Sequence, residues 1–430
     1  MRFIAVLIVL FSLCAPIVEA GCYTKGGVSF SYRTEGKRVI ITRWERNSRH
    51  VEIPAAINRM PVTAVEPGAF SRCKRTVSIA IPKSIIRMDA NALKGCGKLS
   101  YLYFFGNPIP QGASWKLPDS VQGLYLEKNG KTWEKVIRNG EWKGLKMGKF
   151  PLYDRSLEST PPNEKLTLVP KDISRFATRR IIYKEVEGED LHMTALFPPG
   201  WKADDQRGAI LFFFGGGWVT GSYKQFTPQA LELAQRGMVA FLVNYRTKNS
   251  HKTSPKECVS DARSAIRYVR KHAAELGINP NLIAAGGGSA GGHLSAAAAC
   301  FSAFDDPRED PAISARPDAV FLYNGVVDNG PDGGWGYSKI KSYYRSISPA
   351  HNVKPGLPPT LFMLGTRDEL IPISTALRYQ ARMRAAGNRC DLILYPGGFH
   401  GFFNPGVSCS FYPETLSASI RFLREFHFIK

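Results

Sequence analysis

The stretch LIAAGGGSAGG, residues 282–292, decides the fold of the larger part of this 430-residue chain. Its first four residues are apolar and predict a short buried strand, and the small residues after Ser289 predict a helix that continues through Cys300. Gly287 and Gly291 flank the serine at the positions where a tight, strained turn has no room for bulky side chains. The pattern is typical of a nucleophile elbow, whose helix points its first backbone N–H groups at charge developing beside the serine.

Strand-like and helix-like segments alternate from Arg179 onward. This alternation predicts an α/β fold with a mostly parallel sheet and helices on both faces. We expect strands at 209–214, 238–243, 282–285, 360–364 and 392–395, and helices at 229–236, 258–276 and 290–300. The alternative for the glycine-rich loop is phosphate binding at the start of a helix. A dinucleotide site, however, needs GxGxxG after the first strand of its fold, and this loop comes several strands later.

A serine nucleophile needs a general base, and four histidines follow Ser289: His293, His351, His400 and His427. His293 lies four residues into the helix after the elbow and does not reach back to the serine. His427 belongs to a terminal helical stretch, and His351 precedes any suitable acid. His400 lies in the loop GGFHGF, residues 397–402, directly after a predicted strand, and is the predicted base.

The base in turn needs a carboxylate that orients it, and in this fold the acid lies between the serine and the histidine in the chain. Asp368 ends the turn GTRD, residues 365–368, at the end of the predicted strand 360–364. It is the predicted acid. Glu369 is adjacent but points elsewhere, and Asp328, at the end of another strand, is the alternative and is expected to line the pocket.

An acyl-transfer site also needs donors for the oxyanion of the tetrahedral intermediate. The N–H group of Ala290, directly after the serine, is one predicted donor. The others are expected from Gly216 and Gly217 in the run FGGGW, residues 214–218, where missing side chains let the backbone approach the substrate.

Together these motifs resemble the α/β-hydrolase superfamily over residues 179–430, and within it the carboxylesterases related to hormone-sensitive lipase and to bacterial acetyl and feruloyl esterases. The resemblance implies a catalytic triad of Ser289, Asp368 and His400 and an oxyanion hole in the glycine loop, with no cofactor and no metal. One position departs from the family pattern, because Phe214 stands where the family has a histidine that supports the loop. The resemblance also suggests structural roles for residues 244–246 and Asp261. Trp218, Tyr223 and Trp335 are candidates for the floor of a sugar or aryl pocket.

The composition is that of an ordinary globular protein, with 44% hydrophobic and 22% charged residues, which excludes a mostly disordered chain. Lys and Arg number 57 against 36 Asp and Glu, a net charge of +21. Residues 21–150 carry 23 basic and 9 acidic side chains and so hold most of the excess. Such a charge favours anionic partners, here an acidic glycan or a component of the cell envelope rather than nucleic acid.

The first 20 residues predict an export signal. Arg2 precedes an apolar run from Phe3 to Leu13, and Val18-Glu19-Ala20 resembles a cleavage site with small residues at the required spacing. We therefore expect export to the periplasm, the medium or the cell surface, with cleavage after Ala20. A lipoprotein signal ending at Cys22 is the alternative, which Glu19 disfavours because such signals have an aliphatic residue there.

A second module precedes the α/β pattern. AFSRC at 69–73 and ALKGC at 92–96 repeat at an offset of 23, and residues 99–103 suggest a third, degenerate unit. The run VEIPAAINRMPVTAV at 51–65 resembles the BspA-like leucine-rich repeat of bacterial surface proteins, over about residues 23–147. We expect a small solenoid at 21–147 in which Cys73 and Cys96 stack as buried thiols, with a disulfide between them as the alternative. Residues 148–178 have the composition of a linker before the hydrolase domain at 179–430.

The leading hypothesis from the sequence is an exported serine carboxylesterase that removes short acyl groups from a carbohydrate or similar ester. A serine peptidase of the prolyl-oligopeptidase type is the first alternative, disfavoured because no propeller precedes the catalytic module. A surface adhesion protein with an inactive hydrolase domain is the second alternative, disfavoured by the complete set of predicted catalytic residues.

Overall fold

The computed structural model describes residues 20–25, 28–45, 50–76, 78–110, 117–118, 121–126, 129–150, 174, 176–331, 334–395, 397–407 and 410–429. The chain divides into two compact units, Met1–Phe150 and Pro151–Lys430. The predicted export signal lies outside the described residues except for Ala20, and so does most of the predicted linker. The last strand of the first unit continues to Phe150, and the first strand of the second unit begins at Ala177.

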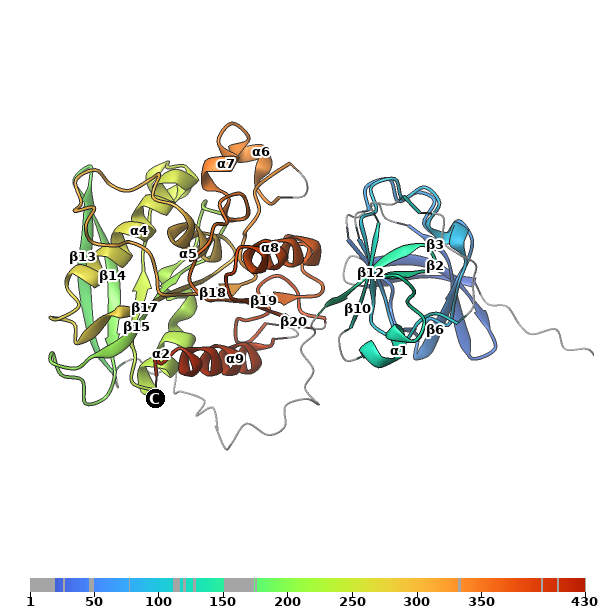
Figure 1. Ribbon diagram of the computed structural model, residues 1–430, viewed down its shortest axis with the longest axis horizontal. Helices are drawn as coiled ribbons and strands as arrows, with labels where there is room; N and C mark the ends of the chain where they lie inside the picture. Colours follow the sequence, from blue (N-terminus) through green and yellow to red (C-terminus); the bar gives the residue numbers. More distant parts are fainter. Residues whose placement is uncertain are drawn as a thin grey trace, which may run out of the picture. The chain divides into compact units, whose positions relative to one another are not determined.

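The C-terminal unit is built on one eight-stranded sheet (Figure 1). The strands lie in the order β13 (Ala177–Val186), β14 (Glu189–Phe197), β16 (Val239–Val243), β15 (Arg207–Phe213), β17 (Ile278–Gly288), β18 (Ala319–Tyr323), β19 (Thr360–Gly365) and β20 (Cys390–Tyr395). The pairs β13–β14 and β14–β16 are antiparallel, and every pair from β16 to β20 is parallel. The predicted mostly parallel sheet is therefore present.

Helices cover both faces of this sheet (Figure 1). One face carries α2 (Thr227–Gln235) and α9 (Tyr412–Glu425), which share a hydrophobic core with the strands. The other face carries α4 (Pro255–Lys271), α5 (Ala290–Cys300) and α8 (Ile373–Ala385). Short helical turns complete the unit: η5 (Tyr223–Phe226), α3 (Lys248–His251), α6 (Tyr337–Ile340), α7 (Tyr344–Ile347) and η6 (Pro349–His351).

Several helix boundaries differ from the sequence prediction. Helix α4 begins earlier, at Pro255, because Ser254 and Glu257 form a capping box, and it ends at Lys271 rather than at residue 276. His427 does not lie in a helix, because α9 ends at Glu425 and His427 has a φ of 61°. Within the described ranges, no helix is both long and apolar enough to cross a membrane.

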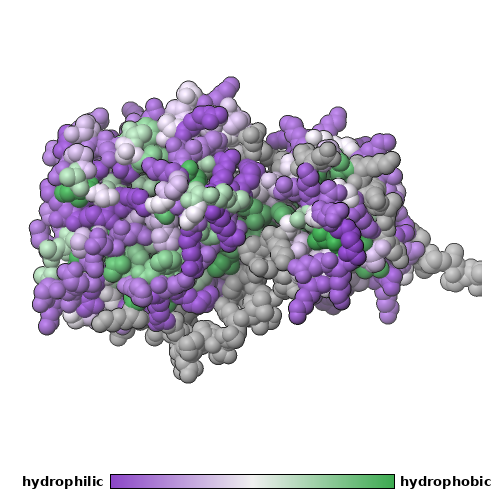
Figure 2. Space-filling view, viewed as in Figure 1, coloured by the Kyte–Doolittle hydropathy of each residue, from purple (hydrophilic) through white to green (hydrophobic). Residues whose placement is uncertain are grey.

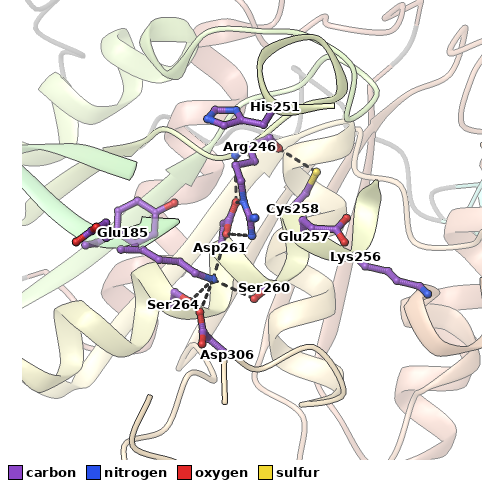
Figure 3. A network of polar contacts seen from close by, with 12 residues as sticks. Glu185, Arg246, His251, Lys256, Glu257, Cys258, Ser260, Asp261, Ser264 and Asp306 are labelled. Atoms are coloured by element: carbon purple, nitrogen blue, oxygen red, sulfur yellow. Dashed lines mark hydrogen bonds and ion pairs between the residues drawn. The ribbon is translucent and has the colours of Figure 1, made fainter. Parts of the chain in front are cut away.

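A buried ion-pair network fastens the edge strand β13 to helix α4 (Figure 3). The Lys184 ammonium lies 3.2 Å from carboxylate oxygens of both Asp261 and Asp306, and it donates to Ser260 and Ser264 at 3.1 Å. Asp261 also accepts hydrogen bonds from the backbone N–H and the guanidinium of Arg246. The Asp261 side chain is fully buried and its charge is compensated by two cations, so this residue has the structural role that the sequence suggested.

The described residues of the N-terminal unit form two six-stranded sheets. In one, β4 (His50–Glu52), β7 (Ser78–Ile81), β9 (Tyr101–Phe104), β10 (Gln122–Leu126) and β12 (Leu145–Phe150) form a parallel ladder, which β11 (Glu141–Trp142) extends by antiparallel pairing. The other contains β1 (Ala20–Lys25), β2 (Val28–Glu35), β3 (Arg38–Trp44), β6 (Met60–Val65), β5 (Ala56–Ile57) and β8 (Arg87–Met88). The unit also contains η1 (Ala90–Leu93) and α1 (Gly130–Glu134).

The two repeated cysteines of this unit are buried free thiols, Cys73 and Cys96. The Cys96 thiol donates to the carbonyl oxygen of Phe70 at 3.5 Å. Its contact with Cys73, together with burial, holds the pKa of the Cys96 thiol far above its ordinary value. The arrangement matches the expected stack of small buried thiols rather than a disulfide.

Candidate active site

Ser289 stands on a strained turn between β17 and α5. Its backbone has a φ of 52° and a ψ of −115°, a conformation that an L-residue adopts only when its surroundings enforce it. A Cβ atom at Gly287 would lie 2.4 Å from the carbonyl oxygen of Phe213, and one at Gly291 would lie 1.9 Å from the same atom. Both glycines are therefore required for β15 to pack against the turn, which is the close approach that the motif predicted.

His400 and Asp368 form a hydrogen-bonded pair in the loops after β20 and β19. Nδ1 of His400 lies 2.8 Å from Oδ2 of Asp368, whose side chain is fully buried, whereas the imidazole is 23% exposed. The other carboxylate oxygen of Asp368 accepts the N–H groups of Leu370 and Ile371 at 2.9 and 2.8 Å. The acid is thus held by backbone donors on one side and presents its second oxygen to the histidine.

The two loops are also fastened to each other. The N–H of Arg367 donates to the carbonyl oxygen of Gly398 at 2.9 Å, and the N–H of Gly397 donates to the Thr366 hydroxyl at 2.8 Å. A side chain at Gly365 would collide with the backbone of Gly398, since its Cβ would lie 2.1 Å from that carbonyl oxygen. These contacts explain why residues 365 and 398 are glycines.

Asn324, which the sequence analysis did not single out, sets the proton position on His400. Its Oδ1 accepts the N–H of Gly401 at 3.0 Å, so its amide nitrogen is the atom that faces Nε2 of His400, at 3.4 Å. Because an amide nitrogen only donates, Nε2 of the neutral imidazole is the unprotonated acceptor, and the proton sits on Nδ1 toward Asp368. This is the tautomer that a general base requires.

Ser289, Asn324, Asp368 and His400 follow β17, β18, β19 and β20, four successive neighbours in the parallel sheet. All four therefore lie at the carboxyl edge of the strands, where open α/β sheets bind their ligands. Among the described residues, no hydrogen bond joins the Ser289 hydroxyl to His400, since Nε2 faces Asn324. Hydrogen bonds between catalytic groups are often long or absent without substrate.

The remaining candidates have other partners. Nε2 of the buried His293 lies 2.8 Å from the carbonyl oxygen of Ile347, and burial lowers the pKa of His293 to about 4. Asp328, the alternative acid, accepts the N–H of Gly330 and a guanidinium N–H of Arg378 rather than His400. His351 lies 2.9 Å from Ser348, through Nδ1, and Glu369 is exposed to solvent.

The glycine loop after β15 lies over the elbow. A Cβ atom at Gly215 would lie 3.4 Å from Cβ of Ser289, so the loop and the serine are in contact range. Gly216 has a φ of 133°, and its Cβ would fall 1.8 Å from the carbonyl oxygen of Thr220, which excludes any other residue. In the part of the chain that the structure describes, the N–H groups of Gly216 and Gly217 donate to no acceptor. Ala290 begins α5, where the first N–H groups have no partner within the helix.

Phe214 supports this loop in place of the histidine that the family has there. Its ring stacks on Tyr245 with centroids 4.1 Å apart, and the Tyr245 hydroxyl donates to the Phe214 carbonyl oxygen at 2.7 Å. The stacked ring and the hydrogen bond of Tyr245 therefore hold the loop at the position where the family has a histidine. Tyr245 thus has the structural role that the sequence suggested.

The three aromatic candidates lie in different surroundings. Trp218 is buried and packs against His293 and Trp335, with ring centroids 4.9 and 5.1 Å away. The Trp335 ring faces the loop, because a Cβ atom at Gly217 would lie 3.0 Å from it. Tyr223 contacts His192 instead. Trp218 thus lies in the glycine loop and Trp335 lies against it.

A serine on a strand–helix elbow, an Asp–His pair on the same sheet edge and a glycine loop with free N–H groups define a hydrolase of the α/β type. Across the described residues, no group of three His, Cys, Asp or Glu side chains is arranged to hold a metal ion.

Comparisons with known proteins identify the hydrolase families that the C-terminal unit matches. Residues 197–330 match the BD-FAE family model, and residues 337–423 match the dienelactone hydrolase family. An acetylxylan esterase of Xylanibacter ruminicola is 33% identical over 45% of this chain and 41% of its own length. Esterase LipC of Mycobacterium tuberculosis is 30% identical over 45% of this chain and 52% of its own length. The chain spans about half the length of these curated relatives.

Among solved structures, esterase 2 of Thermogutta terrifontis in its apo form is 41% identical, with a TM-score of 0.57. The match covers 59% of this chain and 96% of that one. The chain therefore belongs, through its C-terminal unit, to the α/β-hydrolase esterases.

Proposed function

We propose that this protein is an exported serine carboxylesterase that hydrolyses short acyl esters carried by carbohydrate, through an acyl-enzyme on Ser289. The observation that carries the proposal is the His400–Asp368 pair, oriented with its unprotonated Nε2 at the sheet edge where the Ser289 elbow also lies. The free N–H groups of Gly216 and Gly217 beside that elbow add the donors that acyl transfer needs.

The proposed reaction begins when Nε2 of His400 exchanges Asn324 for the Ser289 hydroxyl. The serine oxygen attacks the ester carbonyl while His400 takes its proton, and Asp368 stabilises the imidazolium that forms. His400 then gives the proton to the departing alcohol, which leaves the acyl group on Ser289. A water molecule, deprotonated by His400, attacks the acyl-enzyme, and the serine leaves with the proton as the acid departs.

The oxyanion of each tetrahedral intermediate would accept hydrogen bonds from the N–H groups of Gly216, Gly217 and Ala290. These donors are rigidly held, so they need no reorganisation when the charge develops. Removing one such donor typically costs a factor of about 10²–10³ in rate. The geometry of the glycine loop is therefore as important to the proposal as the Asp–His pair.

The proposed substrate class is based on the names and bound ligands of the similar proteins. One is an acetylxylan esterase, and esterase 2 of Thermogutta terrifontis has been solved with propionate and with butyrate bound. We extend this to short acyl groups on a polysaccharide. The export proposal rests on the sequence of the first 20 residues, which favours the same class because polysaccharides are met outside the cell.

The N-terminal unit is proposed to be a BspA-like leucine-rich repeat that docks on an anionic glycan or envelope component. Its parallel ladder of short strands and its excess of basic residues support this role. The visible face of the molecule, including this unit, is mostly hydrophilic (Figure 2).

The test compares 4-nitrophenyl acetate, butyrate and decanoate with acetylated xylan as substrates of the purified protein. We expect turnover that falls with acyl length and release of acetate from xylan. The Ser289→Ala variant should lose this activity, whereas Ser302→Ala, an exposed serine after α5, should retain it. Turnover of a prolyl amide instead of esters would favour a peptidase. No serine-dependent turnover would favour an adhesion protein.

A further inference from the structure

A cavity of about 380 Å³ lies directly beside the glycine loop. One wall consists of residues 217–219 and so includes Gly217, one of the predicted oxyanion donors. The other walls come from α3, from the start of α4 and from the segment around α6 that carries Lys339 and Tyr343. Its volume is in the range of pockets that hold small molecules, and it is much larger than an acetyl group needs.

The walls of this side pocket are held rigidly to the glycine loop. The N–H of Lys248 donates to the carbonyl oxygen of Trp218 at 3.0 Å, and the N–H of Asn249 donates to that of Val219 at 3.0 Å. The start of α4 is fixed by the capping box between Ser254 and Glu257. A group bound in the pocket is therefore held at a defined position relative to the ester carbonyl.

The charged residues that line the side pocket, among those described, are both cationic: Lys248 and Lys339. Neither ammonium group has a carboxylate partner within the described part of the chain, although the Lys339 ammonium lies 5.3 Å from the centre of the Trp335 ring. A third cation, Lys256, lies over the Tyr343 ring at 4.3 Å. The neighbouring acid, Glu257, already accepts hydrogen bonds from the backbone and hydroxyl of Ser254.

We propose that the side pocket binds a carboxylate on the alcohol part of the substrate, as in an ester of a uronic-acid-containing polysaccharide. The inference deepens the proposed function and rests on it, since a short acyl group leaves this volume to the alcohol. The two lysines supply the positive charge that a carboxylate needs, and Tyr343 forms an aromatic part of the wall. Two cations that line one concave space, and that have no carboxylate partner among the described residues, favour an anionic occupant over a neutral one.

The test uses two substrates that differ only in one group: methyl glucoside and methyl glucuronoside, each with a single acetyl ester at the same hydroxyl. We expect the wild-type protein to hydrolyse the glucuronoside with a kcat/KM about tenfold higher, the effect of two partly exposed ion pairs. Each of the variants Lys248→Gln and Lys339→Gln should lower that ratio about threefold, and the double variant should bring it near one. Added salt should lower the ratio in the wild type as well.

Lys271→Gln is the matched control, because it removes the same charge at the other end of α4, about 24 Å along the helix. It should leave the ratio unchanged. Equal hydrolysis of both glycosides by the wild type, or a preference that survives in the double variant, would overturn the inference while the esterase proposal stands. Absence of turnover with 4-nitrophenyl acetate would instead refute the proposed function itself, and the inference with it.

Discussion

Replacing Asp368 with asparagine should abolish most of the activity without disturbing the fold. Oδ1 of Asp368 accepts two backbone N–H groups, so the amide oxygen of an asparagine must occupy that place. The amide nitrogen then faces Nδ1 of His400, where the carboxylate oxygen now lies at 2.8 Å. Because this nitrogen only donates, it drives the imidazole proton to Nε2 and leaves no base for the serine.

In the variant, neither tautomer of His400 finds an acceptor for its N–H group at both neighbours, so the ordered hydrogen-bond chain of the wild type is lost. A protonated Nε2 would meet the amide nitrogen of Asn324, another donor, at 3.4 Å. The negative charge that stabilises the imidazolium is lost as well. In serine proteases the same change lowers kcat by about 10⁴, which corresponds to about 5.5 kcal/mol. We expect a loss of at least about 10³ in kcat/KM here.

The assay is hydrolysis of 4-nitrophenyl acetate, with thermal unfolding as the check that the variant folds. Asp204→Asn, which changes an exposed aspartate in the same way, is the control and should behave as wild type. A folded Asp368→Asn variant that loses less than about tenfold would refute the assignment of Asp368 and the tautomer argument together.

Three further predictions concern the framework of the site. Lys184→Met should lower the unfolding free energy, measured in urea, by about 3 kcal/mol, because the buried Asp261 loses one of its two cations and Asp306 loses its buried cation. Arg308→Gln removes the exposed cation beside Asp306 and should leave the urea midpoint close to that of the wild type. Burial lowers the pKa of His293 to about 4 in the folded protein. Between pH 6.5 and pH 4 the unfolded chain therefore binds a proton at this residue, and the folded chain does not. This difference should lower the unfolding free energy by about 3 kcal/mol between pH 6.5 and pH 4. The urea midpoint of His293→Gln should fall less steeply over this pH range than that of the wild type. Equal pH dependence of the two midpoints would contradict this prediction. Tyr245→Phe keeps the ring stack on Phe214 but loses a buried hydrogen bond, so it should lose about 1–2 kcal/mol of stability and several-fold in kcat, both measured against wild type. No change in either quantity would mean that this contact does not hold the glycine loop.

The strands β17, β19 and β20, which carry the serine, the acid and the base, could be predicted because each is a buried apolar run followed by a polar or glycine-rich loop. The chain order of serine, acid and base then left His400 as the one histidine in a suitable loop, and the structure brings it to Asp368. Asn324 could not be found in this way, because an asparagine after a strand carries no motif. Its effect on His400 depends on two hydrogen bonds between the loops that follow β18 and β20.

Other features depend on packing that a linear pattern does not record. Strand β17 extends through the glycines to Gly288, although glycine has a poor intrinsic preference for strands, because β15 and β18 pair with it on both sides. Lys184 would be expected on the surface from the sequence, since lysine is rarely buried. In the structure its ammonium group lies at the centre of the buried ion-pair network between β13 and α4. In the N-terminal unit, the repeats at 69–73 and 92–96 pointed to stacked units, but the strands β10 and β12 that extend the ladder carry no repeat signature of their own.

The most direct test of the account is covalent labelling of the nucleophile with paraoxon, followed by peptide mapping by mass spectrometry. A serine activated by His400 should acquire a diethylphosphoryl group at residue 289, within the peptide that spans the end of β17 and the start of α5. The labelling rate should fall by orders of magnitude in His400→Ala. Labelling at another residue, or at the same rate without His400, would contradict the claim that one base at this sheet edge activates Ser289.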